Sequence, residues 1–534
     1  MTQNSVQGEE TREGVPQAQE GAAEGNGGRH GRRRARPRRK HRVLRWSATT
    51  LSVLILGTAG AGYLYYQHLN GNIGTGERSS GDSKAKKSAA NAAGQTPLNI
   101  LLIGSDSRAS TENVKLGGSK DTRGNPPLGD VQMLVHLAAD RKSASVVSIP
   151  RDTRVDIPKC TDPDTDVTYP ATNNIINTSL ARGGAGCTLA TWENLTGVYI
   201  DHWMTIDFSG VVSMADAVGG VEVCVKQNVW DRPLPGVPGG SGLKMKAGRK
   251  EIKGKEALQW LRTRHAFYSD LGRAKAQHMY MNSMIRTLKS QNVFTDGGRL
   301  MDLAEAATKS LDVSEEIGSV KKLYDLSKQL KSVPTDRITM TTMPSIEDPQ
   351  DRNHLVPEPA GAEKMWQMLR DDVPFDDKGT VSKKKPKEKL SEDPAAADDQ
   401  IGVVVQNATR SSTLGPVSGR AGTISGLLVQ KGFARASADT SAALAEERTM
   451  VRYPSADLEG DAQRIAKSLG IPLSSVKKST DVSGVTVVVG ADWREGTTYP
   501  KQSSPKAGDL PDNADEINGA DSDQCMDVYE RYRW

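Results

Sequence analysis

The chain has 534 residues, which is long enough for two or three domains with sizeable cores. Its formal net charge of +5 is modest but unevenly distributed, and only 5% of its residues are aromatic, so stacking platforms for single-stranded nucleic acid are scarce. The sequence contains no P-loop, GxSxG, HExxH or CxxC motif, which leaves nucleotide hydrolysis, esterase, zinc-protease and zinc-thiolate chemistry without support.

The N-terminal region combines a basic cluster with an apolar stretch. Residues 1–45 are predicted to be a disordered basic cytoplasmic tail, because they lack apolar periodicity and end in an Arg-rich run from Arg32 to Arg45. Residues 46–66 contain no charged residue and match the roughly 20 residues that cross a bilayer. Basic residues stay on the cytoplasmic side, so we expect a single-pass cell-membrane protein that contacts membrane lipids and has most of its chain outside the cell. A signal peptide cleaved near Ala59–Ala61 is the alternative.

The first ordered domain is predicted at 97–375, after a flexible Gly/Ser/Ala/Lys spacer at 67–96. Its apolar runs predict buried strands at 98–104, 131–137 and 144–149. Polar side chains stand at the ends of these strands, which is where open α/β sheets place their ligand sites. These side chains are Asp106, Arg108, Asp130 and Arg151.

The following residues alternate between strand and helix patterns. Helices are expected at 174–180, 189–195 and 209–218, and strands at 199–208 and 220–225. This alternation predicts the α/β class, with an α-β-α sandwich around one mixed sheet.

The stretch 256–277 concentrates arginines around one loop. Arg262 and Arg264 end a helical run, Asp270 lies in the loop, and Arg273 and Gln277 are one helical turn apart on one face. Guanidinium groups present a fork of donors matched to phosphate oxygens, so a polyanion site is one interpretation. An ion-paired solvated helix face is the other. His265 is either a general base or a structural histidine.

The second half of the chain begins with a Lys/Glu/Pro/Ala-rich linker at 376–399. A small α/β domain with β-α-β-α-β order is predicted at 400–493, followed by a disordered tail at 494–534. The four cysteines suit an oxidising compartment, in which we expect a Cys160–Cys187 bridge; buried free thiols are the alternative.

Two carboxylates and several arginines in one domain suggest metal-assisted phosphoryl chemistry. Asp106 and Asp130 are candidate ligands for Mg²⁺ or Mn²⁺, which bind through carboxylates together with substrate phosphates. The arginines would then neutralise charge that develops on a transferred phosphoryl group.

Six sequence blocks in a fixed order resemble the LytR-CpsA-Psr family of Gram-positive cell walls, in its actinobacterial type. Residues 401–492 resemble the LytR C-terminal domain that is often attached to that family. The blocks are LNILLIGSDSR (98–108), GDVQMLV (129–135), SIPRDTRVDIP (148–158), ENLTGVYIDHW (193–203), DAVGGVEVCV (216–225) and ALQWLRTRH with DLGRAKAQ (257–277).

The resemblance implies a membrane-anchored phosphotransferase. Family members move a glycopolymer such as teichoic acid, arabinogalactan or capsule from a polyprenyl-pyrophosphate carrier to peptidoglycan, and the prenyl chain lies in an apolar tunnel between sheet and helices. By this resemblance Asp106 and Asp130 would hold Mg²⁺, and Asp270 would order the arginine loop. The pyrophosphate would be bound by Arg108, Arg151, Arg262, Arg264, Arg273 and Gln277.

Two positions depart from the family pattern. Leu128-Gly129 stands where Arg-Ser usually precedes the second aspartate, with Arg123 as a candidate substitute, and Ala276 replaces an arginine before Gln277. Three other functions stay open: a non-catalytic wall-binding or scaffold protein, a polyprenyl-pyrophosphate pyrophosphatase, and a regulator that binds DNA through Arg32–Arg45. No helix-turn-helix pattern supports the last, so no nucleic-acid partner is expected.

Overall fold

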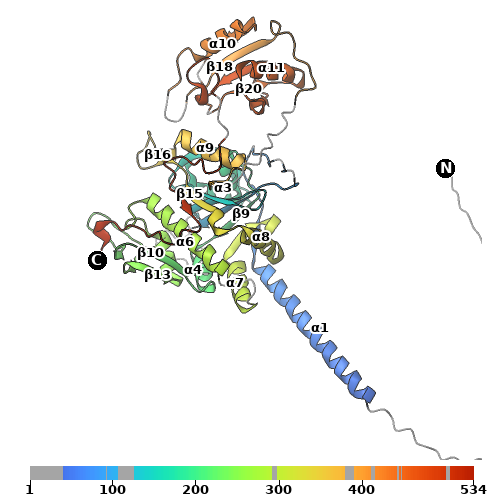
Figure 1. Ribbon diagram of the computed structural model, residues 1–534, viewed down its shortest axis with the longest axis vertical. Helices are drawn as coiled ribbons and strands as arrows, with labels where there is room; N and C mark the ends of the chain where they lie inside the picture. The colour runs from blue at the N-terminus through green and yellow to red at the C-terminus, as the bar shows by residue number, and fades with distance from the viewer. Residues whose placement is uncertain are drawn as a thin grey trace, which may run out of the picture. The chain divides into compact units, whose positions relative to one another are not determined.

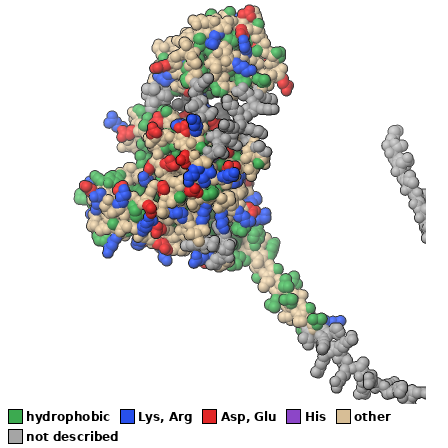
Figure 2. Space-filling model, in the orientation of Figure 1, with side chains coloured by type: hydrophobic (Ala, Val, Ile, Leu, Met, Phe, Trp, Pro, Cys, Tyr) green, Lys and Arg blue, Asp and Glu red, His purple; other side chains and the backbone are tan. Residues whose placement is uncertain are grey.

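The computed structural model describes residues 40–83, 85–88, 90–91, 93–105, 126–290, 297–378, 390–410, 415–441, 444–446, 448–500 and 505–534. The chain divides into two compact units, residues 1–64 and 65–534. Helix α1 (Lys40–Asn72) contains one segment, Leu44–Asn72, that is long and apolar enough to cross a membrane, and none of its apolar window is buried (Figure 1). Figure 2 shows hydrophobic side chains along most of this helix and basic ones at its far end, whereas acidic and basic side chains mix on the visible face of the folded unit.

The first domain is built on an eight-stranded mixed sheet. Strand β2 pairs in parallel with β9 and antiparallel with β3, and β4 pairs antiparallel with β3 and in parallel with β15. The strands in spatial order are β1 (Gly74–Gly76), β14 (Leu311–Ser314), β9 (His202–Ile206), β2 (Leu98–Ser105), β3 (Gly129–Leu137), β4 (Ala144–Ser148), β15 (Ile338–Thr342) and β23 (Ile517–Asn518). This arrangement confirms the predicted mixed sheet.

Helices cover both faces of the sheet. On one face Leu101, Leu134 and Val147 pack against α3 (Leu180–Thr196) and α9 (Pro359–Arg370). On the other face Met133 and Val146 belong to a cluster with side chains of α6 (Asp270–Ser290) and α8 (Val320–Ser332). The predicted α-β-α sandwich is therefore confirmed.

Smaller elements surround this sandwich. The further helices are α4 (Phe208–Ala217), α5 (Gly254–Arg262) and α7 (Gly297–Ser310). Strands β10 (Val221–Val225) and β13 (Gly248–Ile252) form an antiparallel pair. Four further two-stranded pairs join β5 (Arg154–Ile157) to β8 (Thr172–Ile175), β6 (Cys160–Thr161) to β7 (Thr168–Tyr169), β11 (Val229–Trp230) to β12 (Lys244–Met245) and β16 (Ser345–Glu347) to β17 (Leu355–Pro357).

The predicted helix at 174–180 is wrong. Residues 172–175 form β8 and residues 176–179 form a 3₁₀ turn, and only Leu180 begins a helix. A strand forms here because β8 pairs antiparallel with β5, a contact between separate segments that the local helical pattern does not show. The helix predicted at 189–195 is confirmed as the second half of α3, which is capped by Gly197 in a left-handed conformation with φ of 66°.

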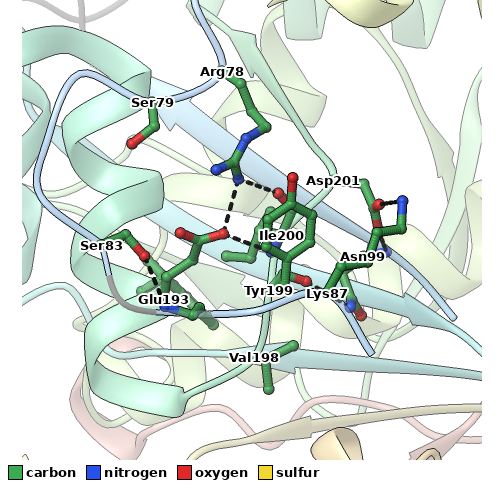
Figure 3. A network of polar contacts seen from close by, with 12 residues as sticks. Arg78, Ser79, Ser83, Lys87, Asn99, Glu193, Val198, Tyr199, Ile200 and Asp201 are labelled. Atoms are coloured by element: carbon green, nitrogen blue, oxygen red, sulfur yellow. Dashed lines mark hydrogen bonds and ion pairs between the residues drawn. The ribbon is translucent and has the colours of Figure 1, made fainter. Parts of the chain in front are cut away.

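Part of the region predicted as a flexible spacer is packed on the first domain. Strand β1 extends the sheet beside β14, and the Arg78 guanidinium lies 2.8 Å from the buried carboxylate of Glu193 in α3. Figure 3 shows Arg78 reaching Glu193 beside the ring of Tyr199. Composition predicts flexibility, but a fully buried glutamate requires a cationic partner, and Arg78 supplies it.

The C-terminal residues also differ from the prediction of disorder. Within residues 505–534, Ile517–Asn518 form β23 at the sheet edge, and Cys525 forms a disulfide with Cys224 of β10. The segment is polar in composition and is therefore predicted to be disordered, but its apolar side chains Met526 and Tyr532 are buried in a core cluster. The Cys160–Cys187 bridge is confirmed.

The small domain has its own five-stranded sheet and core. The predicted β-α-β-α-β order is present, with β19 and β21 in addition. Its elements are β18 (Gly402–Asn407), α10 (Arg420–Gln430), β19 (Arg435–Ala438), β20 (Met450–Tyr453), α11 (Glu459–Leu469), β21 (Val476–Lys478) and β22 (Val485–Val489).

Candidate active site

Charged side chains meet where β3 begins and β4 ends. These strands are antiparallel neighbours, so Asp130 at the start of β3 lies beside Arg151, which follows β4. The Arg151 Nη1 donates to Asp130 Oδ1 at 3.0 Å. Two positions 21 residues apart in the sequence are thus joined by the register of the sheet.

Arg151 contacts three carboxylates, those of Asp130, Asp152 and Asp270. These four residues and Arg273 are called the Arg151 cluster. The Arg151 Nε lies 3.3 Å from Asp152 Oδ2 and 3.6 Å from Asp270 Oδ1. Burial by itself lowers the pKa of Arg151, but the three carboxylates outweigh it and the pKa is raised. Arg151 therefore stays charged at any physiological pH.

Asp270 and Arg273 form the helix side of the cluster. Asp270 is the first residue of α6 rather than a loop residue, and a carboxylate there interacts favourably with the helix dipole. Arg273 Nη2 lies 2.6 Å from Asp270 Oδ1, and only 8% of Arg273 is exposed. Burial lowers the pKa of Arg273, and the charge of Asp270 offsets this only in part. A pre-positioned and poorly hydrated guanidinium of this kind suits an anionic ligand.

Gln277 lies one turn beyond Arg273, as the sequence predicts, and is buried. Its Nε2 donates to the Leu261 carbonyl at 3.0 Å, and the indole of Trp260 donates to the Ala276 carbonyl at 2.9 Å. These two bonds join α5 to α6, so Gln277 fixes the helix that carries Arg273.

The other predicted residues have different positions. The Arg262 guanidinium lies 4.8 Å from the centroid of the Phe208 ring, and Arg264 is exposed just after α5. Within the part of the chain that the structure describes, the ion pairs of the Arg151 cluster include neither of them. Asp106 and Arg108 lie outside the described residues, as does Arg123.

His265 has the surroundings of a structural side chain. Its Nδ1 is 4.0 Å from Asp231 Oδ1, and its ring stacks on Tyr532 with centroids 6.1 Å apart.

Asp152 is not among the site residues predicted from the sequence, because only its contact with Arg151 distinguishes it. Its adjacency to a strand-end arginine was the available signal.

The donor chemistry of the cluster can be compared with that of a magnesium site. Among the described residues, no group of three or more His, Cys, Asp or Glu side chains is arranged to hold a metal. Asp130 is one quarter exposed and offers carboxylate oxygens, the donor type that Mg²⁺ prefers. Asp130 therefore fits one of the two predicted carboxylate ligands, and the other, Asp106, lies outside the described residues.

Two models of known protein families match this chain. A model of the LytR_cpsA_psr family matches residues 64–371, and a model described as LytR cell envelope-related transcriptional attenuator matches residues 400–493. The chain is 30% identical over 328 residues to the cell wall biosynthesis protein LcpA of Corynebacterium glutamicum, covering 57% of this chain and 60% of LcpA. It is 25% identical over 280 residues to the polyisoprenyl-teichoic acid–peptidoglycan teichoic acid transferase TagV of Bacillus subtilis, covering 52% of this chain and 65% of TagV.

Solved structures with similar folds include Bacillus subtilis TagV, at 24% identity and a TM-score of 0.39, covering 52% of this chain and 97% of that one. A LytR-Csp2A-Psr enzyme from Actinomyces oris has 16% identity and a TM-score of 0.40, covering 55% of this chain and 96% of that one. The chain spans less than two thirds of the length of the curated relatives LcpA and TagV. The family model covers more than half of the sequence, and the chain belongs to the LytR-CpsA-Psr family.

Proposed function

We propose that the protein is a membrane-anchored phosphotransferase that moves a glycopolymer from a polyprenyl-pyrophosphate carrier to peptidoglycan. The observation that carries this proposal is the Arg151 cluster, in which carboxylates hold two guanidinium groups at the ends of the central strands. The names of TagV and LcpA, a teichoic acid transferase and a cell wall biosynthesis protein, support the substrate class.

The reaction is a displacement at phosphorus. A peptidoglycan hydroxyl oxygen attacks the phosphorus that bears the glycan, loses its proton, and forms the new phosphodiester. The bond from this phosphorus to the bridging oxygen breaks, and polyprenyl phosphate leaves with that oxygen. Arg151 and Arg273 would bind the pyrophosphate oxygens and stabilise the charge that grows on them, which is the main contribution that a protein makes to phosphoryl transfer.

A magnesium ion belongs to this proposal. Asp130, together with Asp106, would hold it, and a bound Mg²⁺ would neutralise charge on the phosphate oxygens. The shared hydrogen bond between Arg151 and Asp130 orients the Asp130 carboxylate and leaves its second oxygen for another ligand.

The sheet face toward α6 and α8 supports an apolar substrate chain. On the α3 face, Leu101, Ile103 and Leu134 of the central strands are at most 1% exposed. On the α6 face, Leu102 and Val135 in the same strands are only half buried. Incompletely covered apolar side chains at the centre of a sheet are unusual, and a polyprenyl chain lying over them would complete their burial.

Anchoring by α1 would keep the protein next to its lipid-linked substrate. The basic run from Arg32 to Arg45 precedes the apolar segment, so we propose a cytoplasmic N-terminus and an extracellular first domain. Both substrates would then be present on the same side of the membrane.

A transfer assay tests the proposal. The full chain in detergent micelles, with Mg²⁺, a polyprenyl-pyrophosphate glycan and peptidoglycan, should yield polymer that stays on peptidoglycan after hot detergent washing. Arg151→Ala and Arg273→Ala should abolish this product, whereas Arg352→Ala, at an exposed arginine outside the cluster, should not. Full activity of both cluster variants would refute the assignment.

The same assay separates the other candidate functions. Release of polyprenyl phosphate and phosphorylated glycan without linked polymer would identify a pyrophosphatase. Binding of peptidoglycan without either product, unchanged by the cluster variants, would identify a wall-binding scaffold.

A further inference from the structure

The C-terminal segment, residues 505–534, runs along the helix that carries the candidate site. It contacts α6 at three positions beyond Arg273, and each contact uses a polar side chain of α6. These contacts are the ion pair of Lys275 with Asp515 at 3.0 Å and the hydrogen bonds that Asn282 and Arg286 donate to the carbonyls of Asn518 and Gly519 at 3.3 and 3.1 Å. The segment thus follows α6 over most of its length.

The same segment then contacts the loop between α5 and α6, residues 263–269. The Tyr529 backbone N–H donates to the Ala266 carbonyl at 2.9 Å. The Tyr529 ring packs on Tyr268 with centroids 5.3 Å apart, and Tyr532 stacks on His265. Tyr268 has a φ of 73°, a conformation that a residue with a side chain adopts only when its surroundings impose it. The C-terminal segment supplies part of those surroundings.

A covalent bond and two backbone hydrogen bonds fix the segment in this place. Cys525 is joined to Cys224 of β10 across 301 residues of sequence. Next to that bond, Met526 N–H donates to the Cys224 carbonyl and Lys226 N–H donates to the Met526 carbonyl, both at 2.9 Å. The segment therefore connects β10 with the arginine loop.

From these contacts we infer that Tyr529, Tyr532 and the Cys224–Cys525 bridge are positioning residues for substrate binding. They hold the loop 263–269, which contains Arg264, and the start of α6 in the arrangement that binds pyrophosphate. The inference rests on the proposed function for the identity of the ligand, but the ordering of the loop is independent of it. Pre-positioned guanidinium groups bind phosphate better than mobile ones, because less conformational entropy is lost on binding.

Two cysteine variants of the full chain in detergent micelles test the inference. In Cys525→Ser, backbone amides of residues 263–269 should exchange with deuterium about tenfold faster, because their opening equilibrium shifts. The affinity for inorganic pyrophosphate with Mg²⁺, measured by calorimetry, should fall about tenfold. Cys187→Ser removes the other disulfide, which joins α3 to Cys160. It should change neither the exchange of 263–269 nor the pyrophosphate affinity.

A second pair of variants separates positioning from general stability. Tyr532 is 3% exposed, so Tyr532→Ala removes the stack on His265, whereas Tyr532→Phe keeps it. Tyr532→Ala should weaken pyrophosphate binding, whereas Tyr532→Phe should bind pyrophosphate as tightly as the parent. Unchanged loop exchange in Cys525→Ser, or equal losses of affinity in both cysteine variants, would overturn the inference. Failure of the parent to bind pyrophosphate would count against the proposed function, while the exchange data would still decide the role of the segment.

Discussion

Arg151 and Asp130 lie 3.0 Å apart at the ends of the central strands β3 and β4, and this ion pair joins the arginines of the site to its proposed metal ligand. Arg151 also contacts Asp152 and Asp270, so a single guanidinium connects residues from β3, the end of β4 and α6. The site therefore depends on the relative positions of three elements.

Replacing Arg151 is expected to have a large effect on transfer. Arg151→Ala should lower the transfer rate by about 10²–10³-fold, the usual effect of removing one group that stabilises transition-state charge. Arg151→Lys keeps the charge without the planar fork and should recover only part of the rate. Initial rates of polymer transfer at saturating peptidoglycan measure both effects, and equal rates for parent and Arg151→Ala would contradict the role.

Asp270→Asn should destabilise the fold as well as the site. Arg273 is almost fully buried and would lose its ionised partner, which should cost about 1–3 kcal/mol in the free energy of unfolding. Asp515→Asn is the matched control, because Asp515 pairs with Lys275 of the same helix in a partly exposed ion pair that should contribute at most about 1 kcal/mol. Urea unfolding of the two variants provides the comparison, and similar losses would contradict the prediction.

His278 should make the protein less stable in acid. Burial lowers the pKa of His278 in α6 to about 4, whereas an unfolded chain titrates near pH 6.5. Between these values the unfolded state binds a proton that the folded state does not, so stability is lost as pH falls from about 6.5 to 4, by about 3 kcal/mol for this group.

The His278→Gln variant tests this pH dependence. Urea unfolding at pH 7 and pH 4.5 should show a smaller acid destabilisation in the variant than in the parent. The difference isolates His278 from the other titrating groups. An identical loss of stability in both proteins would show that His278 is not responsible.

Arg78→Ala should destabilise the first domain, because Arg78 is the ion-pair partner of Glu193. The Glu193 carboxylate is fully buried and would lose its cationic partner, which should cost about 3 kcal/mol. In Lys226→Ala the exposed pair with Asp527 is lost instead, and the cost should be at most about 1 kcal/mol. Thermal unfolding distinguishes them, and equal melting temperatures would contradict the assigned burial of Glu193.

The central strands and part of the site could be predicted from the sequence because their signals are local. The apolar runs at 98–104 and 131–137 predict β2 and β3, and helical spacing predicts that Arg273 and Gln277 share a face. The domain order also follows from composition, since the linker and the small domain differ sharply in apolar content.

The parts that the sequence did not predict depend on contacts between distant residues. Arg78 looks like a residue of a flexible polar segment until Glu193, 115 residues away, is found buried beside it. Cys525 lies in a polar segment, and its partner Cys224 is 301 residues away. Asp152 is one of many surface carboxylates in the sequence, and only the register of β3 and β4 brings Asp130 to the guanidinium that Asp152 adjoins.

The return of residues 505–534 to the sheet of the first domain makes the small domain an insertion rather than an appendage. The polypeptide leaves the first domain after Lys378, which pairs with Asp336, and rejoins it from Gly508 onward, so the small domain is tethered at both ends. A protein shortened at the linker would lose an edge strand, a disulfide and the contacts to α6 in addition to the small domain. The role of the small domain can therefore be isolated only by excising residues 400–493 and rejoining the flanking chain.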